Sequence, residues 1–128
     1  MKLFVYGTLK NDLHKKIKCD YIGPATTTKK YVVIHDSMFG FPYLLKEKGK
    51  GSFIKGELYK VNEEALTFLD AFEGTPTMYK RGYIKLKKFG KAYVYYGVDT
   101  GFHGEILEKE KENFIKENKE YYDFQYWI

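Results

Sequence analysis

Short apolar segments separated by turn residues run through the first half of the chain. This pattern predicts three strands, over residues 2–6, 25–34 and 53–61, the second of them rich in Thr, Val and Tyr. The first of them ends at Gly7. The segment 39–45 is also apolar, but its Gly40 and Pro42 favour an irregular segment or an edge strand.

Two polar stretches separate these strands. The stretch 10–18 can hold a short helix, and the Lys- and Gly-rich stretch 46–52 is typical of a loop.

A helix is expected to begin directly after Asn62. Asn62 is a good N-cap, and two acidic residues follow it in the first turn, where the helix dipole favours negative charge. Val61 and Leu66 have the spacing of a hydrophobic staple. Gly74 is the natural stop. The apolar stripe at helical spacing consists of Ala65, Leu66, Leu69 and Phe72.

The remainder of the chain predicts a hairpin, a helix and a tail. Residues 79–89 alternate as a strand does, with Ile84 and Leu86 on one face, and Gly90 can turn the chain into a strand over 92–96. Residues 104–119 have helical periodicity, and the aromatic tail 121–128 is expected to dock on the body. Strands dominate, so we expect a single α+β domain over 1–128, a small mixed β-barrel with flanking helices.

Composition and charge narrow the class of protein. With 128 residues and 44% apolar residues, the chain can form one hydrophobic core. The net charge of +5 is modest and is explained by scattered lysines. Cys19 is the single cysteine, which excludes an intrachain disulfide and favours a reducing, cytoplasmic location. No segment approaches the roughly 18 apolar residues of a membrane span, so we expect no membrane association.

Glu73 is the first candidate for chemistry. It lies at the expected end of the helix, where the negative end of the dipole disfavours ionisation, and burial would add to this effect. Both raise the pKa of the carboxyl towards values useful in acid-base catalysis. Arg81, if close, would lower it again. An exposed glutamate at a helix end is the structural alternative, and the sequence leaves the two open.

The turn at Gly7 and the strand after the helix are the next candidates. A glycine after a strand can expose main-chain N–H groups to an anion or an oxyanion, although an ordinary tight turn has the same pattern. Tyr79 and Arg81 have the same strand parity and so point to one face. Arg81 can clamp a carboxylate, or it can pair with Glu57 or Asp70 for structure.

Other chemistries find little support. The residues His14, His35 and His103 lack metal-ligand spacing, and Cys19 has no signature of a nucleophile, so no metal or cofactor is expected. The hairpin contains several lysines among aromatic residues, which can indicate single-stranded nucleic-acid binding. A solvated hairpin explains them as well, and no nucleic-acid partner is predicted. These lysines are Lys85, Lys87, Lys88 and Lys91.

Taken together, these segments resemble the gamma-glutamylcyclotransferase-like family, especially its gamma-glutamylamine cyclotransferase branch. The likeness spans about residues 1–97. The matching segments are Val-Tyr-Gly-Thr-Leu-Lys at 5–10, Gly-Glu-Leu-Tyr at 56–59, Phe-Leu-Asp-Ala-Phe-Glu-Gly at 68–74 with Pro76, Tyr79 and Arg81 beyond it, and Val-Tyr at 94–95. Many relatives continue the first motif with Arg-Gly and later Asn-His, whereas this chain has Asn11, Asp12, Leu13 and His14 after Lys10.

The resemblance implies a compact mixed barrel with a cavity at one end and a cofactor-free enzyme, formally a transferase or lyase. Its reaction would convert a gamma-glutamyl amine, or a related amide, to 5-oxoproline and a free amine. Glu73 would be the catalytic acid and base. The substrate-binding residues would be Tyr6, Gly7, Thr8 and Leu9, acting through backbone N–H groups, with Tyr79 lining the pocket and Arg81 supporting it. A non-catalytic module of the same fold that binds small anions is the alternative, and the leaving amine and oligomeric state stay open.

Overall fold

A computed structural model describes residues 1–7, 9–10, 12–35, 41–73, 75, 79–97 and 104–124. The elements in chain order are β1 (Lys2–Val5), α1 (Leu13–Lys16), β2 (Asp20–His35), β3 (Pro42–Lys48), β4 (Ser52–Lys60), α2 (Glu63–Phe72), β5 (Tyr79–Leu86), β6 (Gly90–Gly97), α3 (Gly104–Lys116) and β7 (Tyr121–Tyr122).

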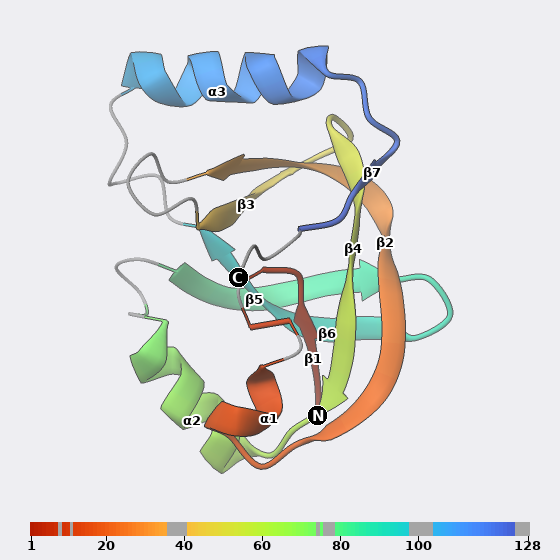
Figure 1. Cartoon of the computed structure of the whole chain (residues 1–128), viewed down its shortest axis with the longest axis vertical. Helices are drawn as coiled ribbons and strands as arrows, with labels where there is room; N and C mark the ends of the chain where they lie inside the picture. The colour runs from red at the N-terminus through yellow and green to blue at the C-terminus, as the bar shows by residue number, and fades with distance from the viewer. Residues whose placement is uncertain are drawn as a thin grey trace.

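Five strands form a closed barrel (Figure 1). They follow the order β2, β5, β6, β1 and β4, and pairing between β2 and β4 closes the ring. The barrel is mixed, because β1 runs parallel to β6 and antiparallel to β4. β3 extends the sheet beyond β2, and β7 extends it beyond β4. This arrangement confirms the expected α+β fold, a small mixed barrel with flanking helices.

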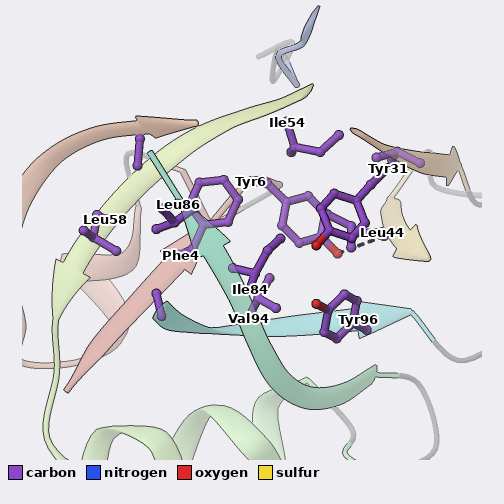
Figure 2. Close-up of a cluster of buried hydrophobic side chains, with 13 residues drawn as sticks. Phe4, Tyr6, Tyr31, Leu44, Ile54, Leu58, Ile84, Leu86, Val94 and Tyr96 are labelled. Atoms are coloured by element: carbon purple, nitrogen blue, oxygen red, sulfur yellow. Dashed lines mark hydrogen bonds between the residues drawn. The ribbon is translucent and has the colours of Figure 1, made fainter. Parts of the chain in front are cut away.

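β1 is buried on both of its faces. Phe4 and Tyr6 belong to the cluster that fills the barrel, together with Leu44 and Val94 (Figure 2). Leu3 and Val5 point the other way, because successive side chains of a strand alternate. They pack in the cluster that includes the buried face of α2. The first strand therefore lies between the barrel interior and the helix that ends at Glu73.

The start of α2 agrees with the sequence pattern. The Asn62 side chain accepts a hydrogen bond of 2.8 Å from the Ala65 N–H, and Glu63 and Glu64 occupy the first turn. Val61 and Leu66 lie in the same cluster, as a staple requires. These local signals are sufficient because capping involves residues close in sequence.

The position of Phe72 corrects the predicted apolar stripe of α2. Ala65, Leu66 and Leu69 are buried, but Phe72 is 49% exposed and stacks on Phe68. The helical period gives the reason. Glu73 follows Leu66 by seven residues, or two turns, and so continues the buried face, whereas Phe72 continues the exposed row of Phe68. The predicted stop at Gly74 lies outside the described residues.

Several other boundaries differ from the sequence expectation, and β2 begins at Asp20, five residues earlier than predicted. β3 continues to Lys48 because it pairs with β2. The predicted loop 46–52 is therefore only a short turn, in which Gly49 and Gly51 have φ angles of +97° and +94°. β3 is an edge strand, one of the two expected alternatives, although residues 36–40 lie outside the described part. β5 ends at Leu86 and α3 at Lys116, each three residues earlier than predicted.

The short helix expected within 10–18 is α1, and the tail docks as expected through β7 as far as it is described. In the described ranges, no helix combines the length and the apolar character that a membrane crossing requires. The same part of the chain brings no three His, Cys, Asp or Glu side chains together as metal ligands.

Candidate active site

A narrow cavity lies where the end of β1 meets the end of α2. Its volume is about 40 Å³, room for a few water molecules, and it opens to solvent. The described residues that line it come from β1 and the turn after it, and from four distant points of the chain. They include Tyr6, Gly7, Leu9, Pro42, Glu73, Tyr79 and Tyr95.

Glu73 contributes a partly buried carboxyl to this cavity. It is the C-cap of α2, and its N–H donates a hydrogen bond of 2.7 Å to the Leu69 carbonyl, which fixes the backbone from which the side chain projects. Burial raises the pKa of Glu73 from 4.5 to about 7. A carboxyl with this pKa exchanges its proton readily near neutral pH. An exposed glutamate at the helix end, the alternative that the sequence left open, would have no such raised pKa.

Arg81 does not oppose this shift. Its Nε lies 3.4 Å from Asp70 Oδ1, and its guanidinium lies over the ring of Tyr93, 5.0 Å from the centroid. Arg81 is not among the described residues that line the cavity. Of the two roles that the sequence left open, the structure therefore shows the pairing with Asp70.

Tyr95 connects the two walls of the cavity. Its hydroxyl donates a hydrogen bond of 2.8 Å to Asp70 Oδ1, in the last turn of α2. Its carbonyl accepts one of 2.8 Å from the Tyr6 hydroxyl, at the end of β1. The sequence placed Tyr95 within a predicted strand but gave it no role, because its partners are 25 and 89 residues away.

The hydroxyl of Tyr6 is fully engaged within the protein. Besides donating to Tyr95, it accepts a hydrogen bond of 3.0 Å from the Leu44 N–H, drawn as a dashed line in Figure 2. Burial raises the pKa of this hydroxyl above its ordinary value. The Tyr6 hydroxyl therefore stays neutral and links β1 to β3 and β6. A ligand can contact only the main chain and the ring of Tyr6.

Gly7 and Tyr79 meet the start of β3. A Cβ added to Gly7 would lie 2.9 Å from Pro42 Cγ, so only glycine fits without a shift of the neighbouring ring. The Tyr79 hydroxyl donates a hydrogen bond of 3.0 Å to the Pro42 carbonyl, and its ring stacks on Tyr43 at 4.9 Å. Pro42 thus forms one side of the cavity. No pattern in the sequence indicated this role. Thr8 lies outside the described residues.

A second, larger groove lies between α3 and β2. Its volume is about 260 Å³, and its lining includes Glu110 and Asn113 on α3, Glu117 just beyond the end of that helix, and His35 and Tyr122. Glu110, Asn113 and Glu117 are exposed, so this groove is open to water. The cavity at Glu73 is the candidate active site, because it combines a carboxyl of raised pKa with the glycine turn.

Comparison with known proteins gives the family. The family model described as gamma-glutamyl cyclotransferase, AIG2-like, matches residues 3–122. The chain belongs to this family.

Curated relatives and solved structures agree with this assignment. Gamma-glutamylaminecyclotransferase of Rattus norvegicus is 36% identical over 93 residues, covering 66% of this chain and 62% of that protein. Gamma-glutamylaminecyclotransferase A of Danio rerio is 36% identical over 95 residues, covering 68% of this chain and 59% of that protein. The chain thus spans about three fifths of the length of these relatives. The crystal structure of an AIG2-like protein from Mus musculus has a TM-score of 0.71 and 29% identity, covering 83% of this chain and 81% of that one.

Proposed function

We propose that the protein converts a gamma-glutamyl amine, or a related gamma-glutamyl amide, to 5-oxoproline and a free amine. Glu73 acts as general base and then as general acid. The observation that carries this proposal is the Glu73 carboxyl, which lines the same cavity as Gly7 and has a pKa raised to about 7. Family membership supports it, since two curated relatives have the name of this activity.

The reaction needs little beyond positioning and proton transfer. The substrate's α-amine attacks its own γ-carbonyl carbon, forming a five-membered ring. Glu73 accepts a proton from the attacking nitrogen and passes it to the leaving nitrogen as the amide C–N bond breaks. Because both partners belong to one molecule, holding the near-attack conformer removes most of the entropic barrier. A carboxyl with a pKa of about 7 suits both transfers.

The wall opposite Glu73 would hold the substrate and its developing charge. Backbone N–H groups of the segment Tyr6, Gly7, Thr8 and Leu9 would donate to the oxyanion, an effect of about 3 to 4 kcal/mol per donor in other enzymes. Tyr79 would confine the glutamyl part from the side. Arg81 would act indirectly, by holding Asp70 and through it the end of α2.

The decisive experiment measures 5-oxoproline release from a panel of gamma-glutamyl amines and peptides, by the wild type and by Glu73→Gln. We expect the variant to lose turnover while its fold stays intact. Glu64→Gln is the matched control, because Glu64 lies exposed on the same helix, in its first turn. Full turnover by Glu73→Gln would reject the role of this residue.

The same experiment separates the enzyme from a binding module. Saturable binding of a small anion by calorimetry, with no 5-oxoproline from any substrate, would identify a module that binds without turnover. A cytoplasmic location and the absence of a nucleic-acid partner stay predictions. Gel-shift measurements with single-stranded RNA and DNA at low salt test the second of them.

A further inference from the structure

The segment after α3 forms a strap, residues 119–124, that runs back across the barrel. In Figure 1 it passes along the edge of β4 towards the centre of the molecule, where the turn after β1 lies. Two contacts with the start of β4 fix its beginning. Ser52 Oγ donates a hydrogen bond of 2.6 Å to the Lys119 carbonyl, and the Phe53 N–H donates one of 2.8 Å to the Glu120 carbonyl.

The middle of the strap is fixed by strand pairing and by a side chain. Tyr121 and Tyr122 pair in parallel with Phe53 and Ile54 of β4. The Tyr122 hydroxyl lies 2.9 Å from Nε2 of His35, at the end of β2. The strap is therefore attached to two barrel strands before it reaches the cavity side of the molecule.

The end of the strap binds the ammonium group of Lys10. Lys10 Nζ donates hydrogen bonds to Asp123 Oδ1 at 2.5 Å and to the Phe124 carbonyl at 2.8 Å. The Lys10 side chain is only 14% exposed, whereas that of Asp123 is 46% exposed. An ammonium largely removed from water needs such acceptors, and both come from the strap.

Lys10 belongs to the turn that forms one wall of the candidate active site. Its own N–H donates a hydrogen bond of 2.9 Å to the Gly7 carbonyl, which closes that turn. Gly7 and Leu9 line the cavity. A fixed Lys10 side chain therefore also restrains the Lys10 backbone, whose N–H closes the turn at Gly7.

We propose that the strap is a positioning device, in which Asp123 and the Phe124 carbonyl hold Lys10 and thereby the substrate-binding turn after β1. The inference rests on the proposed function. Both acceptors lie beyond residue 122, where the family match ends.

The experiment compares Lys10→Met, which removes both contacts, with Asp123→Asn, which removes only the charge. The control is Lys15→Met, since Lys15 forms the neighbouring pair with Asp12 and its side chain is 69% exposed. We expect about a fivefold fall in kcat/KM for 5-oxoproline release in Lys10→Met, a smaller fall in Asp123→Asn, and no change in the control.

Hydrogen exchange of the Lys10 amide gives a readout that does not need turnover. We expect faster exchange at this amide in Lys10→Met and Asp123→Asn, with unchanged exchange at the Leu66 amide, which α2 protects. High salt should speed exchange at Lys10 in the wild type more than in Lys10→Met, because the Asp123 carboxylate is partly exposed.

The outcomes separate this inference from the proposed function. Absence of 5-oxoproline from the wild type would refute the function, and faster Lys10 exchange in the variants would still support the strap's hold on the turn. Unchanged Lys10 exchange in both variants overturns the inference. So does a variant that loses thermal stability while keeping wild-type kcat, KM and exchange at Lys10, since the strap would then be merely structural.

Discussion

The Tyr95 hydroxyl donates a hydrogen bond of 2.8 Å to Asp70 Oδ1, and this contact ties strand β6 to the last turn of α2. Asp70 also forms an ion pair with Arg81, whose Nε lies 3.4 Å from Asp70 Oδ1. Glu73 follows Asp70 by three residues, so the contact anchors the turn that carries the candidate catalytic carboxyl. Through its carbonyl, Tyr95 also holds Tyr6 at the end of β1. One side chain and one carbonyl thereby set the separation of the two cavity walls.

Tyr95→Phe tests this connection. The substitution removes the hydroxyl and leaves the Asp70 carboxylate with Arg81 alone. We expect the free energy of unfolding to fall by about 1 to 2 kcal/mol, because a partly buried hydrogen bond to a charged group is lost. We also expect kcat/KM for 5-oxoproline release to fall, because Glu73 is held less firmly. Chemical denaturation and steady-state kinetics measure the two effects.

Tyr83→Phe is the control for Tyr95→Phe. The Tyr83 hydroxyl also donates a hydrogen bond, to the Tyr93 hydroxyl at 3.0 Å, but Tyr83 is 56% exposed. Its loss should leave stability and kinetics close to those of the wild type. Equal effects of the two substitutions would contradict the anchoring role of Tyr95.

The raised pKa of Glu73 predicts a pH-dependent cost in stability. The pKa rises from 4.5 in the unfolded chain to about 7 in the folded protein, so the folded protein binds the proton more tightly. Protonation of Glu73 therefore stabilises the folded protein. This stabilisation is fully present below pH 4.5 and is lost as the pH rises through 7. Glu73→Gln should therefore gain stability relative to the wild type at pH 8, by up to about 3 kcal/mol, and should gain none at pH 4.

Paired denaturation curves of the wild type and Glu73→Gln at pH 4 and pH 8 measure this difference. Glu64→Gln, at an exposed position of the same helix, should show no such change between the two pH values. A constant difference between the wild type and Glu73→Gln at both pH values would mean that the Glu73 carboxyl is hydrated in the folded protein.

Short-range signals in the sequence were sufficient for much of the fold. Strand alternation, the Asn62 cap and the turn glycines depend on residues a few positions apart, and they predicted most of the elements. The helix end and the glycine after the first strand made Glu73 and Gly7 candidates, and the family resemblance gave them roles. The structure brings both to one cavity.

Long-range partners could not be read from the pattern. Arg81 had two plausible acids within reach, and only the packing of α2 on the barrel selects Asp70. Tyr6 and Tyr95 are 89 residues apart, and Lys10 and Asp123 are 113 apart. Phe72 was misplaced because its apolar side chain fits a buried stripe, whereas the helical period gives that position to the polar Glu73.

The corrected face of α2 predicts contrasting effects of two truncations. Leu69 is fully buried, in a cluster with Leu3 and Val5 of β1, so Leu69→Ala should destabilise the protein by about 2 to 5 kcal/mol. Phe72→Ala removes a larger side chain, but one that is 49% exposed, and should cost less than about 1 kcal/mol. Urea denaturation of both variants decides whether Phe72 lies outside the core, and a larger loss in Phe72→Ala than in Leu69→Ala would contradict it.

The contact between Gly7 and Pro42 predicts a substitution with a specific rescue. In Gly7→Ala the new Cβ would lie 2.9 Å from Pro42 Cγ, closer than such atoms normally approach, so the turn or the start of β3 must shift. We expect a loss of about 1 to 3 kcal/mol in stability and a fall in kcat/KM, because both residues line the cavity. Thermal denaturation and 5-oxoproline release measure the two losses.

Pro42→Ala in the Gly7→Ala background should restore much of the lost stability. It removes the Cγ that the new methyl group meets, and it keeps the Pro42 carbonyl's position as the acceptor for the Tyr79 hydroxyl. The two changes should therefore be strongly non-additive, because they act on one contact. Additive losses in the double variant would show that Gly7 is required for another reason, such as the approach of a substrate to its backbone N–H. In that case the fall in kcat/KM would persist in the double variant.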